Sequence, residues 1–342
     1  MCAEPEAAAP ATALRVRGLT VRTAKGAALV SDVDLDLAEG AALGIVGESG
    51  CGKTTTLRAI AGLLGRGLRV TSGEIQAGGR DLLTLSQREL ERVRGREVGV
   101  IWQDPLAALD PVISVGHQIA EVVRTHDKGS ASAATARALE MMRLVELPRA
   151  ESLYRSYPHQ LSGGQRQRVV IAAALAAGPA LLLADEPTTA LDVTVQQQIL
   201  RLFARLRTEL ALTLVVVSHD LAVVGEVCEQ VAIMYGGRIV ETGQTREVFA
   251  SPRHHYTAAL LKSVPSVTSV GRRPVGIPGD PPASVAEDHC SFAPRCAAAR
   301  ELCRASRPVL DGPLLNRPGP HAVACHFPVP DAENHKKDER SD

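Results

Sequence analysis

Eight residues near the start of the chain have the types and spacing of a phosphate-binding loop. Gly47–Thr54 reads Gly-Glu-Ser-Gly-Cys-Gly-Lys-Thr, which matches the pattern G-x-x-x-x-G-K-[ST] between a strand and a helix. Glycines let backbone N–H groups close around phosphate oxygens, and the following helix adds its partial positive charge. We expect Lys53 to reach the β- and γ-phosphates of ATP and Thr54 to offer its hydroxyl to Mg²⁺. The alternative is a glycine-rich turn without a ligand. The predicted nucleotide contacts in this loop are Gly47, Glu48, Ser49, Gly50, Cys51, Gly52, Lys53, Thr54 and Thr55.

Two adjacent carboxylates follow an apolar run later in the chain. The run Leu181–Ala184 ends in Asp185 and Glu186. A buried strand here would deliver Asp185 to the metal side of the phosphates, and Glu186 could orient and deprotonate an attacking water. Taken alone, an Asp-Glu pair is a solvated strand end. Together with a phosphate loop, it indicates ATP hydrolysis.

The elements around these residues alternate between strands and helices, which predicts an α/β fold with a largely parallel sheet. Apolar runs that read as buried strands lie at 41–47, 98–102, 180–185 and 213–219, and helical periodicity follows at 54–64, 112–150, 165–177 and 193–210. Past residue 250 the composition shifts to Pro, Gly and Arg, so a boundary is expected near 250–265. Disorder is expected for residues 1–13 and for the polar tail 329–342.

Bulk composition narrows the class of protein. The chain has 342 residues, with 38 Lys plus Arg against 38 Asp plus Glu, and this balance argues against a nucleic-acid partner. No run approaches the roughly 20 apolar residues of a membrane span, and residues 1–13 lack a secretory signal. We therefore expect a cytoplasmic protein that meets a membrane only through a partner.

Four of the seven cysteines crowd into the last sixth of the chain. Cys290, Cys296, Cys303 and Cys325 have the spacing C-x5-C-x6-C-x21-C. In a reducing compartment such a cluster suggests metal ligation before disulfides. The spacing fits neither common zinc sites nor small ferredoxins, although four thiolates could still form a tetrahedral cage through tertiary folding.

Between the two phosphate-site segments lies Leu161–Arg168, Leu-Ser-Gly-Gly-Gln-Arg-Gln-Arg. With it the chain resembles the ATP-binding subunits of ABC transporters, whose signature motif is LSGGQ. The resemblance extends to Gln103 (Q-loop), to Ala190-Leu191-Asp192 (D-loop) and to His219 (switch histidine). It implies a P-loop ATPase with a RecA-like core, an antiparallel β subdomain and a helical subdomain at about 104–178.

By this resemblance two ATPase subunits dimerise head to tail, and each ATP lies between the phosphate loop of one and LSGGQ of the other. Glu186 would be the general base, His219 would contact the γ-phosphate, and Gln103 would sense metal and water. The residues implied to contact nucleotide outside the loop are Asp185, Asp192, Ser162, Gly163, Gly164 and Gln165, with Thr54 and Gln103 as Mg²⁺ ligands.

One family feature is missing. The family usually stacks adenine on an aromatic residue, here expected at about 21–29, but no aromatic precedes Trp102. Either the base packs on Val21 or its neighbours, or base recognition is weak. Stacking contributes about 1 kcal/mol, so affinity would fall without loss of hydrolysis.

Several segments resemble the oligopeptide/dipeptide importer branch, and more its first ATPase subunit than its second. They are 103–111, 157–164, 184–200, 251–265, 277–279 and 290–326. The resemblance implies an ATPase domain over 14–262 and a C-terminal extension over 263–328 that carries a [4Fe–4S] cluster. Zn²⁺ or four unligated thiols are the alternatives for the cysteines.

The partners implied are a second ATPase subunit, two permease subunits at the cytoplasmic membrane face and, indirectly, a solute-binding protein. The cargo implied is di- or oligopeptides. Nickel or another small solute, a soluble ABC ATPase acting on DNA or ribosomes, and a non-hydrolysing regulatory subunit are the alternatives.

Overall fold

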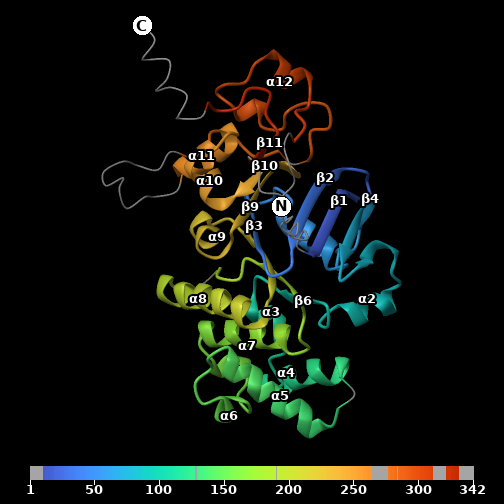
Figure 1. The fold of residues 1–342 in the computed structure, drawn as a ribbon, viewed down its shortest axis with the longest axis vertical. Helices are drawn as coiled ribbons and strands as arrows, with labels where there is room; N and C mark the ends of the chain where they lie inside the picture. The colour runs from blue at the N-terminus through green and yellow to red at the C-terminus, as the bar shows by residue number, and fades with distance from the viewer. Residues whose placement is uncertain are drawn as a thin grey trace, which may run out of the picture.

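The computed structural model describes residues 11–127, 129–189, 191–263, 276–282, 284–310 and 321–330. Two sheets and a group of helices are arranged along an elongated body (Figure 1). The smaller sheet lies to one side of the larger one, the helices α4 to α7 gather at one end, and the last part of the chain lies at the other. The α/β architecture with these subdomains is the one predicted.

The smaller sheet is antiparallel, with strand order β2-β1-β4-β5. Its strands are β1 (Thr12–Thr23), β2 (Ala28–Ala38), β4 (Leu68–Ala77) and β5 (Arg80–Asp81). Apolar side chains on its inner face pack with helix α1 (Lys53–Ile60) in one continuous core. β1 begins at Thr12, inside the stretch 1–13 for which disorder was expected; residues 1–10 lie outside the described part.

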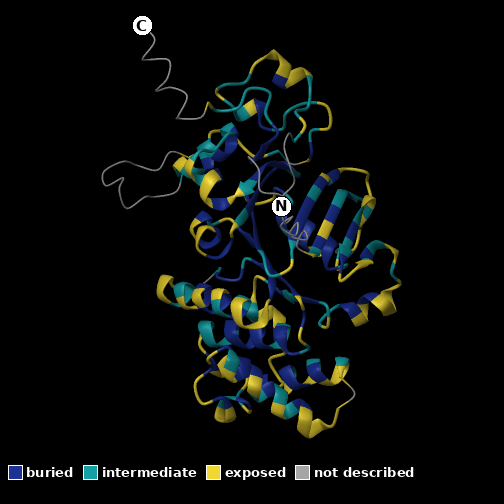
Figure 2. Ribbon diagram, viewed as in Figure 1, coloured by how far each residue is buried: buried dark blue, intermediate teal, exposed yellow. Residues whose placement is uncertain are grey.

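The larger sheet has the order β11-β10-β9-β3-β8-β7-β6. The five strands from β9 to β6 run parallel, β10 pairs antiparallel with β9, and β11 pairs antiparallel with β10. The bounds are β3 (Ala42–Val46), β6 (Val98–Ile101), β7 (Leu181–Asp185), β8 (Thr213–Ser218), β9 (Gln230–Tyr235), β10 (Arg238–Gln244) and β11 (Ala322–Val323). Its central strands are buried along their length (Figure 2), as expected for a sheet covered on both faces.

Helices enclose this sheet and extend from it. The segment between β6 and β7 forms the helical subdomain. Its buried apolar side chains form one continuous core with those on one face of the larger sheet. The helices are α2 (Gln87–Val93), α3 (Pro105–Ala108), α4 (Val115–His126), α5 (Ala131–Leu144), α6 (Ala150–Leu153), α7 (Gly163–Leu175), α8 (Val193–Leu210), α9 (Leu221–Val227), α10 (Thr245–Ala250), α11 (His255–Ser263) and α12 (Glu301–Ala305), with short 3-10 turns η1 (Leu82–Thr84), η2 (Pro158–Gln160) and η3 (Ala293–Arg295).

The C-terminal extension shares the large sheet with the ATPase domain. Helix α11 ends at Ser263. Strand β11 then adds to the edge of β10, with Ala322 opposite Thr242 and Val323 opposite Glu241. Near the expected tail, the Val329 N–H donates to the Arg253 carbonyl at 2.8 Å; residues 264–275 and 331–342 lie outside the described part.

Candidate active site

The phosphate loop connects the end of β3 to the start of α1. Gly50 and Gly52 have φ of 79° and 107°, in the left-handed region that side chains avoid. Gly47 is required for another reason, since a Cβ there would lie 2.1 Å from the Met234 carbonyl oxygen. Glycine at these places therefore permits a tight loop directly before a helix N-terminus, the arrangement predicted for a phosphate site.

Lys53 lies against its own loop. Its side-chain amine donates to the carbonyl oxygens of Gly47 at 2.8 Å and Glu48 at 2.9 Å, and the residue is 5% exposed. The Cys51 thiol is buried behind it, with Sγ 3.8 Å from the amine. Burial raises the pKa of Cys51, so this thiol stays protonated and serves as a small packed residue. Ser49 is exposed, and Thr55 is half-buried in the first turn of α1.

Thr54, in the first turn of α1, contacts Asp185 at the end of β7. The Thr54 hydroxyl donates to Asp185 Oδ1 at 3.0 Å, and Asp185 is 2% exposed at the end of β7. Burial raises the pKa of Asp185, although the Thr54 hydrogen bond opposes that rise. A hydroxyl and a carboxylate at a phosphate loop are oxygen donors of the kind that Mg²⁺ prefers, so the residues present fit a magnesium ion.

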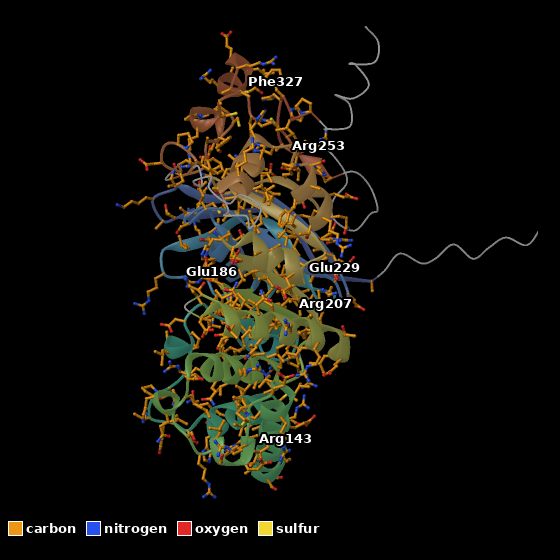
Figure 3. The ribbon with its side chains drawn as sticks, turned by 90° about the vertical axis from the view of Figure 1, so that its left-hand side faces the viewer. Arg143, Glu186, Arg207, Glu229, Arg253 and Phe327 are labelled. Atoms are coloured by element: carbon orange, nitrogen blue, oxygen red, sulfur yellow. The ribbon has the colours of Figure 1, made fainter. Side chains whose placement is uncertain are left out.

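Glu186 gathers three polar groups from different parts of the chain. Its Oε1 lies 3.1 Å from His219 Nδ1, and its Oε2 accepts from Gln103 Nε2 at 3.1 Å and from the Thr189 hydroxyl at 2.9 Å. Glu186 itself has φ of +46°, which turns the chain sharply after β7. Figure 3 shows it between the helical subdomain and the extension. The sequence anticipated Gln103 and His219 here but assigned no role to Thr189.

The Glu186 carboxylate is held in its ionised form. Burial raises the pKa of Glu186, but hydrogen bonds from His219 and Thr189 outweigh burial and leave the pKa below its ordinary value. An ionised carboxylate can accept a proton from water. The arrangement of Glu186, Gln103 and His219 is therefore competent for hydrolytic chemistry beside the phosphate loop.

The LSGGQ segment begins helix α7 in the helical subdomain. Ser162 caps the helix, with its hydroxyl accepting from the Gln165 N–H at 3.3 Å, and Gln165 Oε1 accepts from the Ser162 N–H at 3.0 Å. A Cβ on Gly164 would lie 2.6 Å from Val195 Cγ1, whereas one on Gly163 meets nothing closer than 3.5 Å. Gly164 thus lets α7 approach α8 closely.

The D-loop lies just before α8. Asp192 is exposed and caps this helix by accepting from the Val195 N–H at 3.0 Å. Ala190 lies outside the described residues. The cap gives Asp192 a local structural role in the single chain.

The position expected to seat adenine offers no platform at Val21. This side chain is 0% exposed and belongs to the core of the smaller sheet. Of the alternatives given for the base, burial removes Val21 itself, because strand β1 turns this side chain inward. Ala24 and Lys25, in the turn that follows, are exposed, so packing of the base on neighbours of Val21 and weak base recognition are the alternatives that stay.

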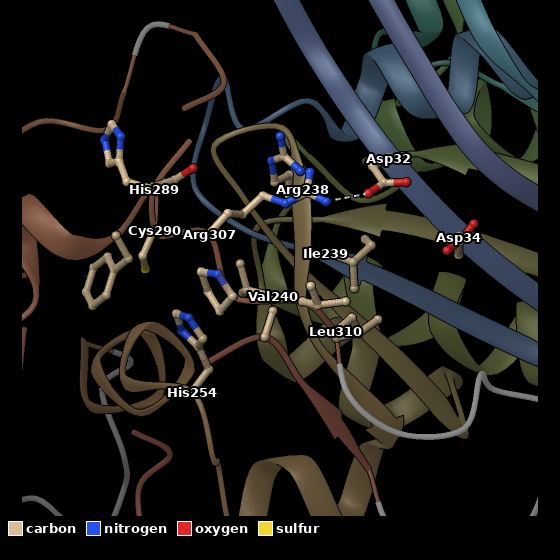
Figure 4. Close-up of a pocket in the computed structure, with 15 residues that line it drawn as sticks. Asp32, Asp34, Arg238, Ile239, Val240, His254, His289, Cys290, Arg307 and Leu310 are labelled. Carbon is tan, nitrogen blue, oxygen red and sulfur yellow. Dashed lines mark hydrogen bonds and ion pairs between the residues drawn. The ribbon is translucent and has the colours of Figure 1, made fainter. Parts of the chain in front are cut away.

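The four late cysteines line one cavity, together with Phe292 and Phe327. All four are free thiols, and burial raises the pKa of Cys290, Cys296 and Cys325. Within the described residues, no group of three or more His, Cys, Asp or Glu side chains is placed to hold a metal ion. The fold thus brings the thiols to one place but not into a ligand geometry. A second pocket adjoins this one, and Figure 4 shows Cys290 beside His254 at its wall.

Two residues outside the predicted set also contact the phosphate loop. Arg295 of the extension forms an ion pair with Glu48, and the Tyr256 hydroxyl accepts from the Glu48 N–H at 2.9 Å. Neither contact could be read from the sequence, because 247 residues separate Arg295 from Glu48 and 208 residues separate Tyr256 from Glu48.

No helix in the described part of the chain is both long and apolar enough to cross a membrane.

Comparisons with known proteins agree with this geometry. The ABC transporter family model matches residues 30–189, and the model of the oligopeptide/dipeptide transporter C-terminal region matches residues 240–303. In fold, the chain is similar to the dimeric ATP-binding cassette MJ0796 bound to ADP and Pi, with a TM-score of 0.61 and 31% identity over 68% of this chain and 99% of that one. It is also similar to cbiO1 from Clostridium perfringens, with a TM-score of 0.63 and 27% identity over 70% and 91% of the two chains.

Similar curated proteins are named as ATP-binding components of peptide transporters. A probable peptide ABC transporter ATP-binding protein of Sinorhizobium fredii is 48% identical over 86% of this chain and 87% of its own. The dipeptide transport ATP-binding protein DppD of Haemophilus influenzae is 42% identical over 89% and 91%. The oligopeptide transport protein OppD of Bacillus subtilis is 49% identical over 74% and 71%. The chain therefore belongs to the family of ABC transporter ATP-binding subunits that carry the oligopeptide/dipeptide transporter C-terminal region.

Proposed function

We propose that this chain is the ATP-hydrolysing subunit of an importer for di- or oligopeptides and acts at the cytoplasmic face of the membrane through two permease subunits. The observation that carries the proposal is the convergence of Gln103 and His219 on the Glu186 carboxylate, one residue beyond Asp185 and its hydrogen bond to Thr54. Family membership and the peptide-transport names of the relatives support the cargo.

In the proposed mechanism the chain's residues bind, orient and deprotonate. The loop amides and Lys53 hold the phosphates, and His219 orients the γ-phosphate. Glu186 accepts the proton of the attacking water as the bond to the γ-phosphorus forms and ADP leaves. A Mg²⁺ ion held by Thr54, Gln103 and Asp185 would neutralise charge on the phosphate oxygens.

Hydrolysis is proposed to require a partner ATPase subunit. Ser162 and the Gly163 and Gly164 amides lie at the start of α7, where a helix N-terminus favours an anion. In a head-to-tail dimer this end would complete the partner's nucleotide site, as the dimeric form of the MJ0796 cassette suggests. Closure on ATP and opening after hydrolysis would then move the permease subunits.

The substitution Glu186→Gln tests the catalytic assignment. It removes the proton acceptor but keeps the shape of the side chain, so ATP should still bind while turnover falls by about 100-fold or more. The ATP-bound dimer should persist on size-exclusion chromatography. Glu226→Gln, on an exposed residue of α9, is the matched control and should keep wild-type turnover. Near-normal hydrolysis by Glu186→Gln would remove Glu186 as the base.

Cargo is tested with the assembled transporter. Uptake of a labelled dipeptide into vesicles containing the permease subunits and the cognate solute-binding protein should require ATP and this chain. Uptake of nickel but not peptide would replace the cargo assignment. Co-purification with ribosomes or DNA instead of permease subunits would replace transport itself, and a complete complex without ATPase activity would indicate a regulatory subunit.

We further propose that Cys290, Cys296, Cys303 and Cys325 hold a structural metal centre, a [4Fe–4S] cluster or else Zn²⁺. Their convergence on one cavity supports this, and ligation would require the thiols to deprotonate and move closer together. Iron, sulfide and zinc analysis of anaerobically purified protein tests it. Absence of all three would leave four unligated thiols.

A further inference from the structure

An ion pair between a buried arginine and a partly buried glutamate joins the C-terminal extension to the phosphate loop. Arg295 ends the turn η3, and its guanidinium contacts Glu48 in two places, Nη1 to Oε2 at 2.6 Å and Nη2 to Oε1 at 3.0 Å. The Arg295 side chain is 4% exposed and that of Glu48 25%. Paired contacts of this kind fix the carboxylate in orientation as well as in distance.

The extension and the core hold Arg295 from its other sides. Its Nε donates to the Pro278 carbonyl at 2.8 Å, Nη2 to the Ile277 carbonyl at 3.1 Å, and Nη1 to the Tyr235 hydroxyl at 3.2 Å. The guanidinium therefore has a fixed position before it meets Glu48. Lysine could not reproduce this, because it lacks the planar fork.

The backbone of Glu48 is held by the same neighbourhood. Tyr256 accepts from the Glu48 N–H, and its ring packs on Tyr235 and Phe292 with centroid separations of 4.5 and 5.5 Å. Phe292 belongs to the extension, three residues before Arg295. The loop residue is thus fixed at both its side chain and its amide by a cluster to which the extension contributes.

We propose that Arg295 is a positioning residue of the nucleotide site, through which the extension fixes the phosphate loop and neutralises Glu48. The inference rests on the proposed nucleotide site. An unpaired carboxylate in this loop would repel a polyphosphate, and the loop would lose the contact that sets the orientation of Glu48. The extension would then act on nucleotide affinity directly, without contacting the nucleotide.

The test measures binding of Mg·ADP to the full-length chain by calorimetry. Arg295→Ala should weaken affinity about tenfold or more, because it leaves the partly buried Glu48 carboxylate unpaired beside the phosphates. Arg307→Ala is the matched control. Arg307 ties the same extension to β2 through Asp32 at 2.9 Å, away from the phosphate loop (Figure 4), so its affinity should stay within about twofold of wild type.

The double variant Glu48→Gln/Arg295→Ala separates charge from fold. Because it removes the unpaired carboxylate, it should recover most of the lost affinity, and a melting curve would show whether each variant is folded. Arg295→Lys, which keeps the charge without the fork, should fall between Arg295→Ala and wild type. Wild-type affinity in Arg295→Ala, or no recovery in the double variant, would overturn the inference. Failure of the wild-type chain to bind Mg·ADP would instead overturn the proposed nucleotide site.

Discussion

The Tyr256 hydroxyl provides the most direct measure of how firmly the phosphate loop is held. Tyr256→Phe removes one oxygen and leaves the ring, with its packing on Tyr235 and Phe292, unchanged. Tyr256 is 0% exposed, so water cannot easily replace the oxygen. The variant therefore leaves the Glu48 N–H without the partner it has at 2.9 Å.

The cost follows from that single unpaired group. A buried donor without a partner costs about 1–3 kcal/mol. For 342 residues, an unfolding entropy of about 2.1 cal/mol/K per residue amounts to about 0.7 kcal/mol/K. The midpoint temperature of unfolding should therefore fall by about 1–4 °C. The same loosening should weaken Mg·ADP binding, since the amide belongs to the phosphate loop.

Differential scanning calorimetry of the full-length chain measures the shift. The control is Tyr154→Phe, which removes the same atom from another buried tyrosine. Among the described residues, the hydroxyl of Tyr154 has a single contact, 3.4 Å from that of Thr135. It should lower the midpoint by less than Tyr256→Phe does. If the two variants melt together, or if Tyr256→Phe melts with wild type, the Tyr256 hydroxyl does not stabilise the loop and this reasoning fails.

Two further predictions concern packing and pH. Gly164→Ala should destabilise the chain by about 1–3 kcal/mol, because its Cβ would lie 2.6 Å from Val195 Cγ1. Gly163→Ala is the control and should be tolerated, because its Cβ would lie 3.5 Å from the nearest atom, Leu191 Cδ2. Equal melting temperatures of the two variants would contradict the close approach of α7 to α8. For Glu241, which is 0% exposed, burial raises the pKa, but hydrogen bonds, that of His321 first, outweigh burial and hold the pKa below its ordinary value of 4.5. The stability that this carboxylate contributes is present above that value and is lost as the pH falls through the lower folded-state pKa. The difference in the midpoint temperature of unfolding between wild type and Glu241→Gln should therefore become smaller as the pH falls below about 4.5. A constant or growing difference would refute this.

The motifs of the ATP site could be read from sequence because each carries its own local geometry. The glycine pattern of the phosphate loop specifies a tight turn before a helix, and the apolar run before Asp185 specifies a buried strand. The resemblance to ABC transporter ATP-binding subunits implied that Glu186 and His219 lie near the γ-phosphate, and parallel strands that end at one edge of the sheet agree with it. The structure adds the contact between these two side chains, with 3.1 Å from Glu186 Oε1 to His219 Nδ1.

The contacts made by the extension had no such local signal. Arg295 stands between Cys290 and Cys296, and nothing in its neighbours indicates a partner 247 residues away. Val21 could not be separated from its neighbours for a related reason: alternation along a strand does not say which face is covered until helix α1 is placed. In both cases the outcome depends on long-range packing, which cannot be read from a single sequence.

The strand order suggests why the extension and the phosphate loop are coupled at all. β11 of the extension pairs with β10, β10 with β9, and β9 with β3, which leads into the phosphate loop. The extension is thus connected to the loop twice, through continuous backbone hydrogen bonds across the sheet and through the Arg295–Glu48 ion pair. A segment that only lay on the surface of the ATPase domain would need neither connection. A shift at the edge of the sheet would reach the loop through two routes that meet at β3, and this makes the extension a part of the nucleotide-binding unit rather than a domain attached to it.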